Sequence, residues 1–131
     1  MRVIICLDDG LGMIFGGKRQ SRDKAVLADI ASEYGSVSIL PFSEKMIAQA
    51  GLSYTLKSSL DEIGKDETAF IESINPATFA DRIEELVIYR WNRKYLADMK
   101  CTLDLSGFKR VSVTEFVGNA HDKITKEVFK K

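Results

Sequence analysis

The sequence predicts an α/β fold with a mostly parallel central sheet, helices on both faces and an antiparallel edge at the C-terminus. Short apolar runs alternate with segments whose apolar residues recur at helical spacing, which is typical of a parallel sheet with helical crossovers. The first run stops at two aspartates and a glycine-rich loop, the kind of strand end at which open α/β proteins place ligands. The last runs follow one another without a clear helix between them, which favours antiparallel pairing at that edge.

The N-terminal segment predicts a strand, a loop and a helix. Arg2–Leu7 (RVIICL) is almost entirely apolar and predicts a buried strand. Met13–Phe15 is an apolar island between glycines, which fits either a loop or a short strand. Over Asp23–Tyr34 apolar residues recur three and four positions apart, so we expect a helix with Ser21 as its cap and Gly35 as its end.

The next segment alternates strand and helix again. Val37–Leu40 predicts a second strand. Ser43–Ala50 predicts a helix that Ser43 caps and Gly51 ends, because serine is a good N-cap and glycine a good helix stop. Leu52–Leu56 fits a third strand, and Ser58–Ile63 fits a single capped helical turn.

The C-terminal half predicts more strands than helices. Thr68–Ile71 predicts a fourth strand, and Asn75–Ile83 a helix with proline at its first position. Leu86–Trp91 is a strong strand, and Arg110–Phe116 alternates as a half-buried strand does. Ile124–Lys130 alternates like an edge strand, but its lysines and glutamate also suit a short helix, so both interpretations stay open.

Composition limits the class of protein. A chain of 131 residues predicts one domain spanning residues 1–131. Lys and Arg together number 19, as do Asp and Glu, and this zero net charge argues against general nucleic-acid binding. The apolar run Val3–Leu7 is too short for a signal peptide, and no run approaches a membrane span, so we expect no membrane association. With only Cys6 and Cys101, we expect a reduced protein in the cytoplasm.

Particular segments resemble the dihydrofolate reductase family. The segment ADRIEELVIYRW…AD…GFKRVSVTEF is similar to that family's helix, strand, acidic residue and late strand. The segment RVIICLDDGLGMIFGGKRQSRDKAVLADI is similar in length and placement to its first strand, mobile loop and substrate helix. The resemblance covers nearly the whole chain and implies that family's fold. It also implies that Asp23 stands where the family keeps its single pocket carboxylate, which makes Asp23 the candidate catalytic residue.

Other segments depart from the reductase pattern. Where the resemblance implies a Gly-Gly pair beside the cofactor pyrophosphate, this chain has Phe70–Ile74, with Glu72 at its centre. Pro41-Phe42-Ser43 replaces the Gly-Arg-(Ser/Thr) motif that would hold the 2′-phosphate of NADPH, and Lys18–Gln20 replaces a tryptophan that normally precedes the carboxylate. The cofactor therefore stays open, and these departures argue against NADPH.

A second resemblance is to short, uncharacterised bacterial proteins with CLDD…KRQSRD and YRWNRKY-like signatures, some of which bear a ribonuclease Z label. Nucleases of that metallo-β-lactamase type need a His-x-His-x-Asp-His cluster for two zinc ions. This chain has one histidine, His121, so we predict no metal site.

The polar segment before the first helix is the first candidate site. Arginine binds phosphate or carboxylate through two parallel hydrogen bonds, and a helix N-terminus favours negative charge. Asp23 would then bind an N–H edge of a heterocycle. The alternative is that Ser21 and Asp23 only cap the helix and the cations are solvated. The candidate ligand-binding residues here are Arg19, Gln20, Arg22 and Asp23.

The second candidate is the segment Tyr89–Tyr95. Its aromatic and arginine side chains suit a nucleobase or a phosphate, and Arg90, Asn92 and Arg93 are the candidate ligand-binding residues. Alternatively Trp91 lies in the core or in a dimer contact, since tryptophan, tyrosine and arginine also anchor protein interfaces.

Asp8 and Asp9 form the third candidate. Paired carboxylates after a strand bind Mg²⁺ or act as acid and base, although Asp-Asp-Gly is also good turn chemistry. His121 follows a turn at Gly118-Asn119, so we expect it at the surface, and the spacing predicts no Ser–His–Asp arrangement.

These observations predict a small protein that binds an anionic, nucleotide-like ligand in a pocket after the first strand. Whether it is an enzyme stays open. One alternative is an NADPH-dependent pterin or flavin-type reductase. Another is a homodimeric interaction module without catalysis, which would dimerise through Tyr89–Tyr95.

Overall fold

A computed structural model describes all 131 residues of the chain. It contains two α-helices, two short 3₁₀ helices (η1 and η2) and ten strands. In chain order they are β1 (Arg2–Leu7), β2 (Gly12–Phe15), β3 (Lys18–Arg19), α1 (Lys24–Tyr34), β4 (Val37–Ile39), α2 (Pro41–Gln49), β5 (Tyr54–Leu56), η1 (Leu60–Glu62), β6 (Thr68–Phe70), η2 (Pro76–Arg82), β7 (Glu85–Arg90), β8 (Met99–Lys100), β9 (Lys109–Phe116) and β10 (Ile124–Lys130).

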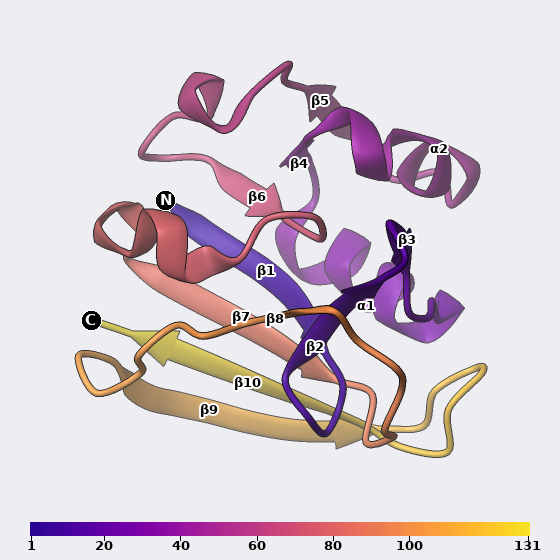
Figure 1. Cartoon of the computed structure of the whole chain (residues 1–131). Helices are drawn as coiled ribbons and strands as arrows, with labels where there is room; N and C mark the ends of the chain where they lie inside the picture. The colour runs from indigo at the N-terminus through magenta and orange to yellow at the C-terminus, as the bar shows by residue number, and fades with distance from the viewer.

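Seven strands form one sheet in the order β5-β4-β6-β1-β7-β10-β9 (Figure 1). The first five run parallel, and β10 and β9 are antiparallel to their neighbours. A second, three-stranded sheet has the order β3-β2-β8. The predicted α/β class, the parallel centre and the antiparallel C-terminal edge are thus confirmed.

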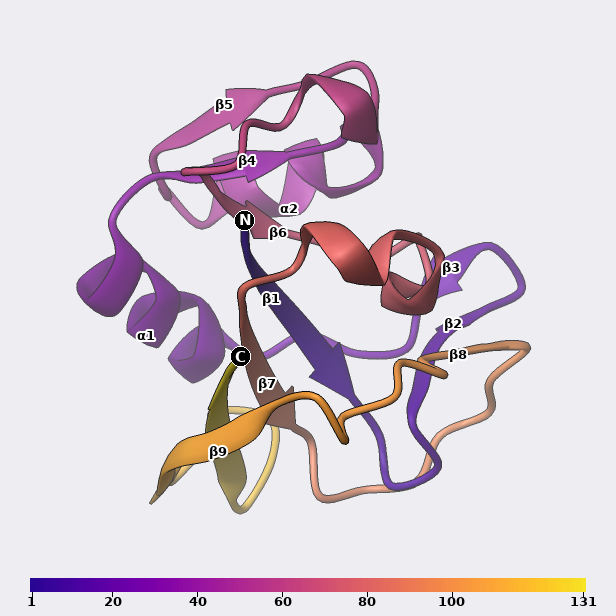
Figure 2. The ribbon, with the colours of Figure 1, turned by 90° about the vertical axis from the view of Figure 1, so that its left-hand side faces the viewer.

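The large sheet is covered on both faces, because alternate residues of each strand point to opposite sides. From β1, Val3 and Ile5 pack into one apolar cluster, together with η2 and the smaller sheet. Ile4 packs into the other cluster, together with buried residues of α1 and α2. Figure 2 shows α1 on one side of β1 and η2 on the other. With both faces covered, the carboxyl ends of the central strands remain the natural place for a site.

Two helix starts differ from the predictions. The cap of α1 is Asp23 rather than Ser21, because the Asp23 side chain accepts a hydrogen bond from the backbone N–H of Ala25. The second helix begins at Pro41, and Ser43 lies inside it. Proline needs no N–H partner in a first turn and its fixed φ suits a helix, so α2 starts at Pro41 rather than after Ser43.

The C-terminal tail is a strand, since β10 pairs along its length with β7 and β9. The prediction that Arg110–Phe116 is half-buried is wrong. Every residue of β9 is exposed except Phe116, which is partly buried. The alternating pattern did not predict burial correctly there, because β9 is the outermost strand of the sheet and pairs only with β10. Neither α-helix has the length and apolar character needed to cross a bilayer.

Candidate functional site

Asp23 lies at the start of α1. Its carboxylate is buried, and both of its oxygens accept hydrogen bonds from other residues of the chain. Oδ1 accepts backbone N–H bonds from Ala25 and Asn119, at 2.8 and 2.7 Å. Oδ2 accepts from the backbone N–H of Ala120 and from Nδ1 of His121, at 2.8 and 2.9 Å. Burial alone would raise the pKa of this carboxyl, but these donors outweigh it and lower the pKa to about 2. The carboxylate therefore fastens the loop between β9 and β10 to the start of α1.

His121 is buried, contrary to the prediction that it lies at the surface. Its ring stacks on Trp91 with centroids 4.6 Å apart. Because Nδ1 faces the Asp23 carboxylate, we assign the ring proton to Nδ1, and Nε2 is the acceptor. Nε2 lies 2.7 Å from the Tyr95 hydroxyl and 3.3 Å from Ser21 Oγ. The structure thus places Ser21 beside the Asp23–His121 pair, an arrangement that sequence spacing did not predict, and the Nε2 lone pair accepts the shorter bond from Tyr95.

Gly118 allows the β9–β10 loop to approach Asp23. A Cβ atom at this position would lie 2.5 Å from the backbone oxygen of His121 and 2.7 Å from Asp23 Oδ2. Only glycine fits such an approach.

Asp8 and Asp9 lie in different environments, although they are neighbours in the sequence. Asp8 is buried and accepts from the backbone N–H groups of Gly12 and Tyr95, at 2.6 and 3.0 Å, and from Nε2 of Gln20 at 3.2 Å. Asp9 is exposed. Gln20 leaves one buried acceptor, its Oε1, without a partner, which a donor group from a ligand or a water would satisfy. Asp8 therefore holds the loop after β1 in place.

Arg19 forms an ion pair with Glu72 of the same chain. Its Nε and Nη2 donate to the two carboxylate oxygens of Glu72, at 2.9 and 2.8 Å. Ser43 Oγ donates to the same carboxylate at 2.6 Å, and the guanidinium lies over the Phe42 ring. Glu72, which stands where the reductase resemblance implies glycine, is thus neutralised by Arg19.

Arg90, Asn92 and Arg93, the three predicted ligand-binding residues next to Trp91, lie outside the candidate cavities. Arg90 pairs with Glu127, and Asn92 donates to Oγ1 of Thr125 at 2.9 Å. Arg93 is exposed and forms no ion pair. None of the three lines the cavities beside Trp91 or the hollow between the helices described below.

The structure argues against Tyr89 and Trp91 as the residues of a dimer contact. β7 is a central strand, with β1 on one side and β10 on the other. Tyr89 and Trp91 are 0 % and 5 % exposed, so neither side chain is available to a partner.

Two small cavities lie where the segment before α1 meets Trp91. Ser21 and Arg22 line the first, and Arg19 and Gln20 line the second. Each has a volume of about 10 Å³, which is room for about one water molecule. Cys6 borders both cavities, and burial raises the pKa of its thiol, which keeps the thiol protonated. The two predicted segments do meet, but side chains of the chain itself fill the space between them.

A larger hollow of about 330 Å³ lies beside the first cavity, between α1 and α2. Arg22 and Lys24 are its only charged residues, both are exposed, and neither forms an ion pair. The other residues that line it are Leu27, Met46, Gln49, Ala50, Asn119 and Ala120.

Sequence reasoning identified Arg22 but missed the rest of this hollow. Lys24 lies two positions further along the chain, so a basic segment extended into the first helical turn would have included it. Nothing in the sequence places Asn119 next to α1, since that contact depends on the bonds between the β9–β10 loop and Asp23.

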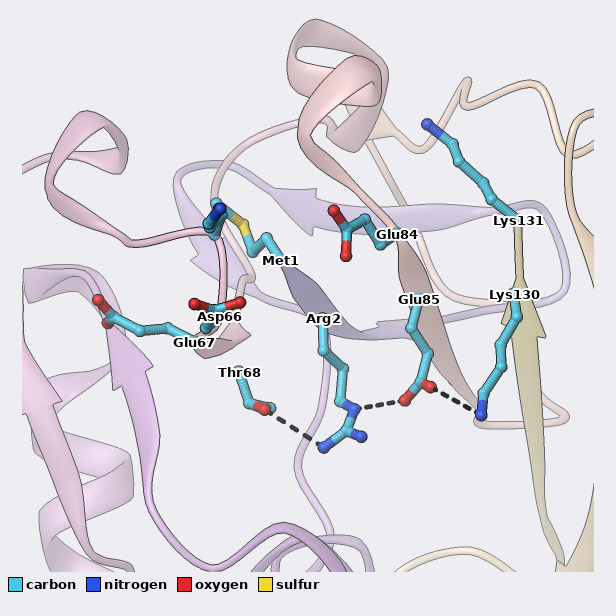
Figure 3. Close-up of a pocket in the computed structure, with 10 residues that line it drawn as sticks. Met1, Arg2, Asp66, Glu67, Thr68, Glu84, Glu85, Lys130 and Lys131 are labelled. Atoms are coloured by element: carbon cyan, nitrogen blue, oxygen red, sulfur yellow. Dashed lines mark hydrogen bonds and ion pairs between the residues drawn. The ribbon is translucent and has the colours of Figure 1, made fainter.

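A hollow of about 400 Å³ lies at the amino ends of the parallel strands, opposite the candidate site (Figure 3). It lies where β1, β6 and β7 begin, away from the strand ends that carry the candidate residues. Arg2 bonds to Glu85 and Thr68, and Lys130 pairs with Glu85 (Figure 3). Four basic and four acidic side chains line it, so it lacks the one-sided charge of the hollow between the helices.

Comparisons with known proteins give one clear result. No model of a protein family matches the chain, and neither does any curated protein. Among solved structures, the chain is similar to the dihydrofolate reductase from Enterococcus faecalis in complex with NADP(H) and RAB-propyl, with a TM-score of 0.69 and 12% sequence identity. The likeness covers 98% of this chain and 94% of that one. It shows that the fold is that of dihydrofolate reductase.

Proposed function

We propose that the chain binds a small anionic, nucleotide-like ligand in the hollow between α1 and α2. The observation that carries this proposal is the pair Arg22 and Lys24. Both are cations without a carboxylate partner, at the rim of a hollow that contains no acidic residue. Arg22 supplies a planar fork for a phosphate or carboxylate, and Lys24 supplies a second positive charge.

The rest of the hollow suits the body of such a ligand. Leu27 and Met46 provide an apolar surface, and the amides of Gln49 and Asn119 provide polar contacts at its border. Its volume of about 330 Å³ falls in the range typical of small-molecule sites. The helix N-terminus itself contributes little, because Asp23 already accepts from the first turn of α1. Recognition of the anion therefore falls to the two side chains.

A panel of ligands tests this function. We expect adenosine 5′-monophosphate to raise the melting temperature of the wild-type chain more than inorganic phosphate does, and adenosine to raise it least, because ligand binding stabilises by mass action. The double variant Arg22→Ala/Lys24→Ala should lose the shift. Lys18→Ala is the matched control, since Lys18 is another exposed, unpaired cation nearby that does not line the hollow. Equal losses in both variants, or no shift with any anion, would refute the proposal.

A second candidate is a reductase that uses NADPH, and the likeness to a reductase structure with bound NADP(H) favours it. The contact between Glu72 and Arg19 argues against it, because a carboxylate stands where the resemblance implies a close approach of phosphate to glycine. Measurable NADPH oxidation in the presence of dihydrofolate would make the reductase the better proposal. We expect none.

A further inference from the structure

The outer edge of the large sheet is open. β9 pairs with β10 along one side, and no strand lies beyond it. An unpaired edge presents backbone N–H and C=O groups to which another strand can bind. β9 has eight residues and no proline, so it lacks two of the features that commonly protect such an edge, although its charged residues and a bulge are two others that it has. This edge is therefore suited to pairing.

β9 also leaves apolar surface uncovered. Val111 and Val113 are 50 % and 45 % exposed, and Val117, just after the strand, is 79 % exposed. β-branched residues stabilise strands by packing against cross-strand neighbours. About half of the surface of the two strand valines thus remains uncovered within one chain.

A bulge determines which residues of β9 share a face. Against β10, Ser112 pairs with Val128 and Arg110 pairs with Phe129, so Val111 is the extra residue. Directly opposed residues of an antiparallel pair lie on one face.

Val113 and Glu115 pair with Glu127 and Thr125. Since alternate residues of β10 share a face with Phe129, Arg110 lies on the same side as Val113 and Glu115. Ser112 and Thr114 lie on the other side.

We propose that β9 pairs antiparallel with β9 of a second copy of this chain, about a two-fold axis through Val113. Val113 then packs against the partner's Val113. Ser112 lies opposite Thr114 of the partner subunit, where two hydroxyls can bond. With Val111 bulged as it is against β10, Arg110 lies opposite the partner subunit's Glu115. The strand is thus complementary to itself in charge, shape and hydrogen bonding.

The charged residues are available for this contact. Arg110 has an exposed side chain and uses Nη1 on Glu127, which leaves its other donors open. The one ion pair of Glu115 is with Lys123, at 2.8 Å, and both side chains are more than half exposed. Exposed pairs of this kind contribute little and exchange readily.

Sedimentation velocity over a concentration series tests the proposal. We expect the wild-type chain to approach twice the monomer mass as concentration rises. Val113→Lys should stay monomeric, because two ammonium groups would meet at the axis. Its fold should be kept, since within one chain the ammonium lies beside Glu127, the cross-strand neighbour. Val117→Lys, which adds the same charge just outside the paired segment, should dimerise like the wild type.

A pair of charge variants tests the register. Arg110→Glu and Glu115→Arg should each be monomeric, because each places like charges opposite one another. Their equimolar mixture should dimerise, because both cross-strand pairs become complementary. Circular dichroism verifies that each variant is folded. A wild-type chain that is monomeric throughout, a Val113→Lys variant that still dimerises, or a mixture that stays monomeric would each overturn the proposal.

Discussion

The imidazole of His121 lies flat against the indole of Trp91, with ring planes 17° from parallel. This contact joins the β9–β10 loop to the end of β7, and Asp23 joins the same loop to α1. Three segments far apart in the sequence are held together at one ring. One wall of the proposed ligand hollow, at Asn119 and Ala120, belongs to this loop.

Replacing His121 with alanine should therefore destabilise the chain. The change removes a stacked ring and leaves a buried carboxylate short of one donor, so we expect a loss of about 3 kcal/mol in the free energy of unfolding. Urea unfolding measures it. Because the missing group is an imidazole, added free imidazole should raise the melting temperature of the variant but not that of the wild type. A variant as stable as the wild type would show that the ring does not fasten the loop.

Asp23 should make stability depend on acid pH. Its pKa in the folded chain is about 2, below its ordinary 3.8. A lowered pKa contributes stability that is present above 3.8 and is lost as the pH falls towards 2. Between about pH 5 and about pH 2, the free energy of unfolding of the wild type should fall by about 2 kcal/mol more than that of Asp23→Asn. Parallel pH profiles for the two chains would contradict this assignment.

Gly118 should not tolerate a side chain. Gly118→Ala brings a methyl group against the His121 backbone and the Asp23 carboxylate, and we expect a loss of about 1–3 kcal/mol. Gly107→Ala is the control, because a Cβ atom there meets nothing within 4 Å. Thermal unfolding of both variants measures the difference, and equal melting temperatures would show that the loop approaches α1 less closely than described.

Arg19 and Glu72 should be energetically coupled. Their side chains are 25% and 10% exposed and share two hydrogen bonds. A double-mutant cycle with Arg19→Ala and Glu72→Ala should give a coupling free energy of about 1–3 kcal/mol, because removing either partner leaves the other partly buried and unpaired. Additive effects of the two changes would mean that the pair is not formed in solution.

Local patterns predicted the central strands well and the candidate site only in part. An apolar run such as Arg2–Leu7 is determined by burial on both faces, which the sequence records directly. The exposure of β9 cannot be read from its own residues, because it follows from the position of this strand at the outside of the sheet.

The candidate residues show the same division. Arg22 was predicted from local chemistry, as an arginine just before a helix. The burial of His121 follows from contacts with Asp23 and Trp91, which lie 98 and 30 residues away, and no local pattern encodes contacts at that range.

Backbone amide NMR during a titration with adenosine 5′-monophosphate tests the proposed site most directly. We predict saturable shifts at Leu27, Gln49 and Ala120, which line the hollow between α1 and α2, and their loss in Arg22→Ala/Lys24→Ala. Shifts confined to Arg2 and Glu85, at the amino ends of the parallel strands, or no shifts at all, would contradict the account.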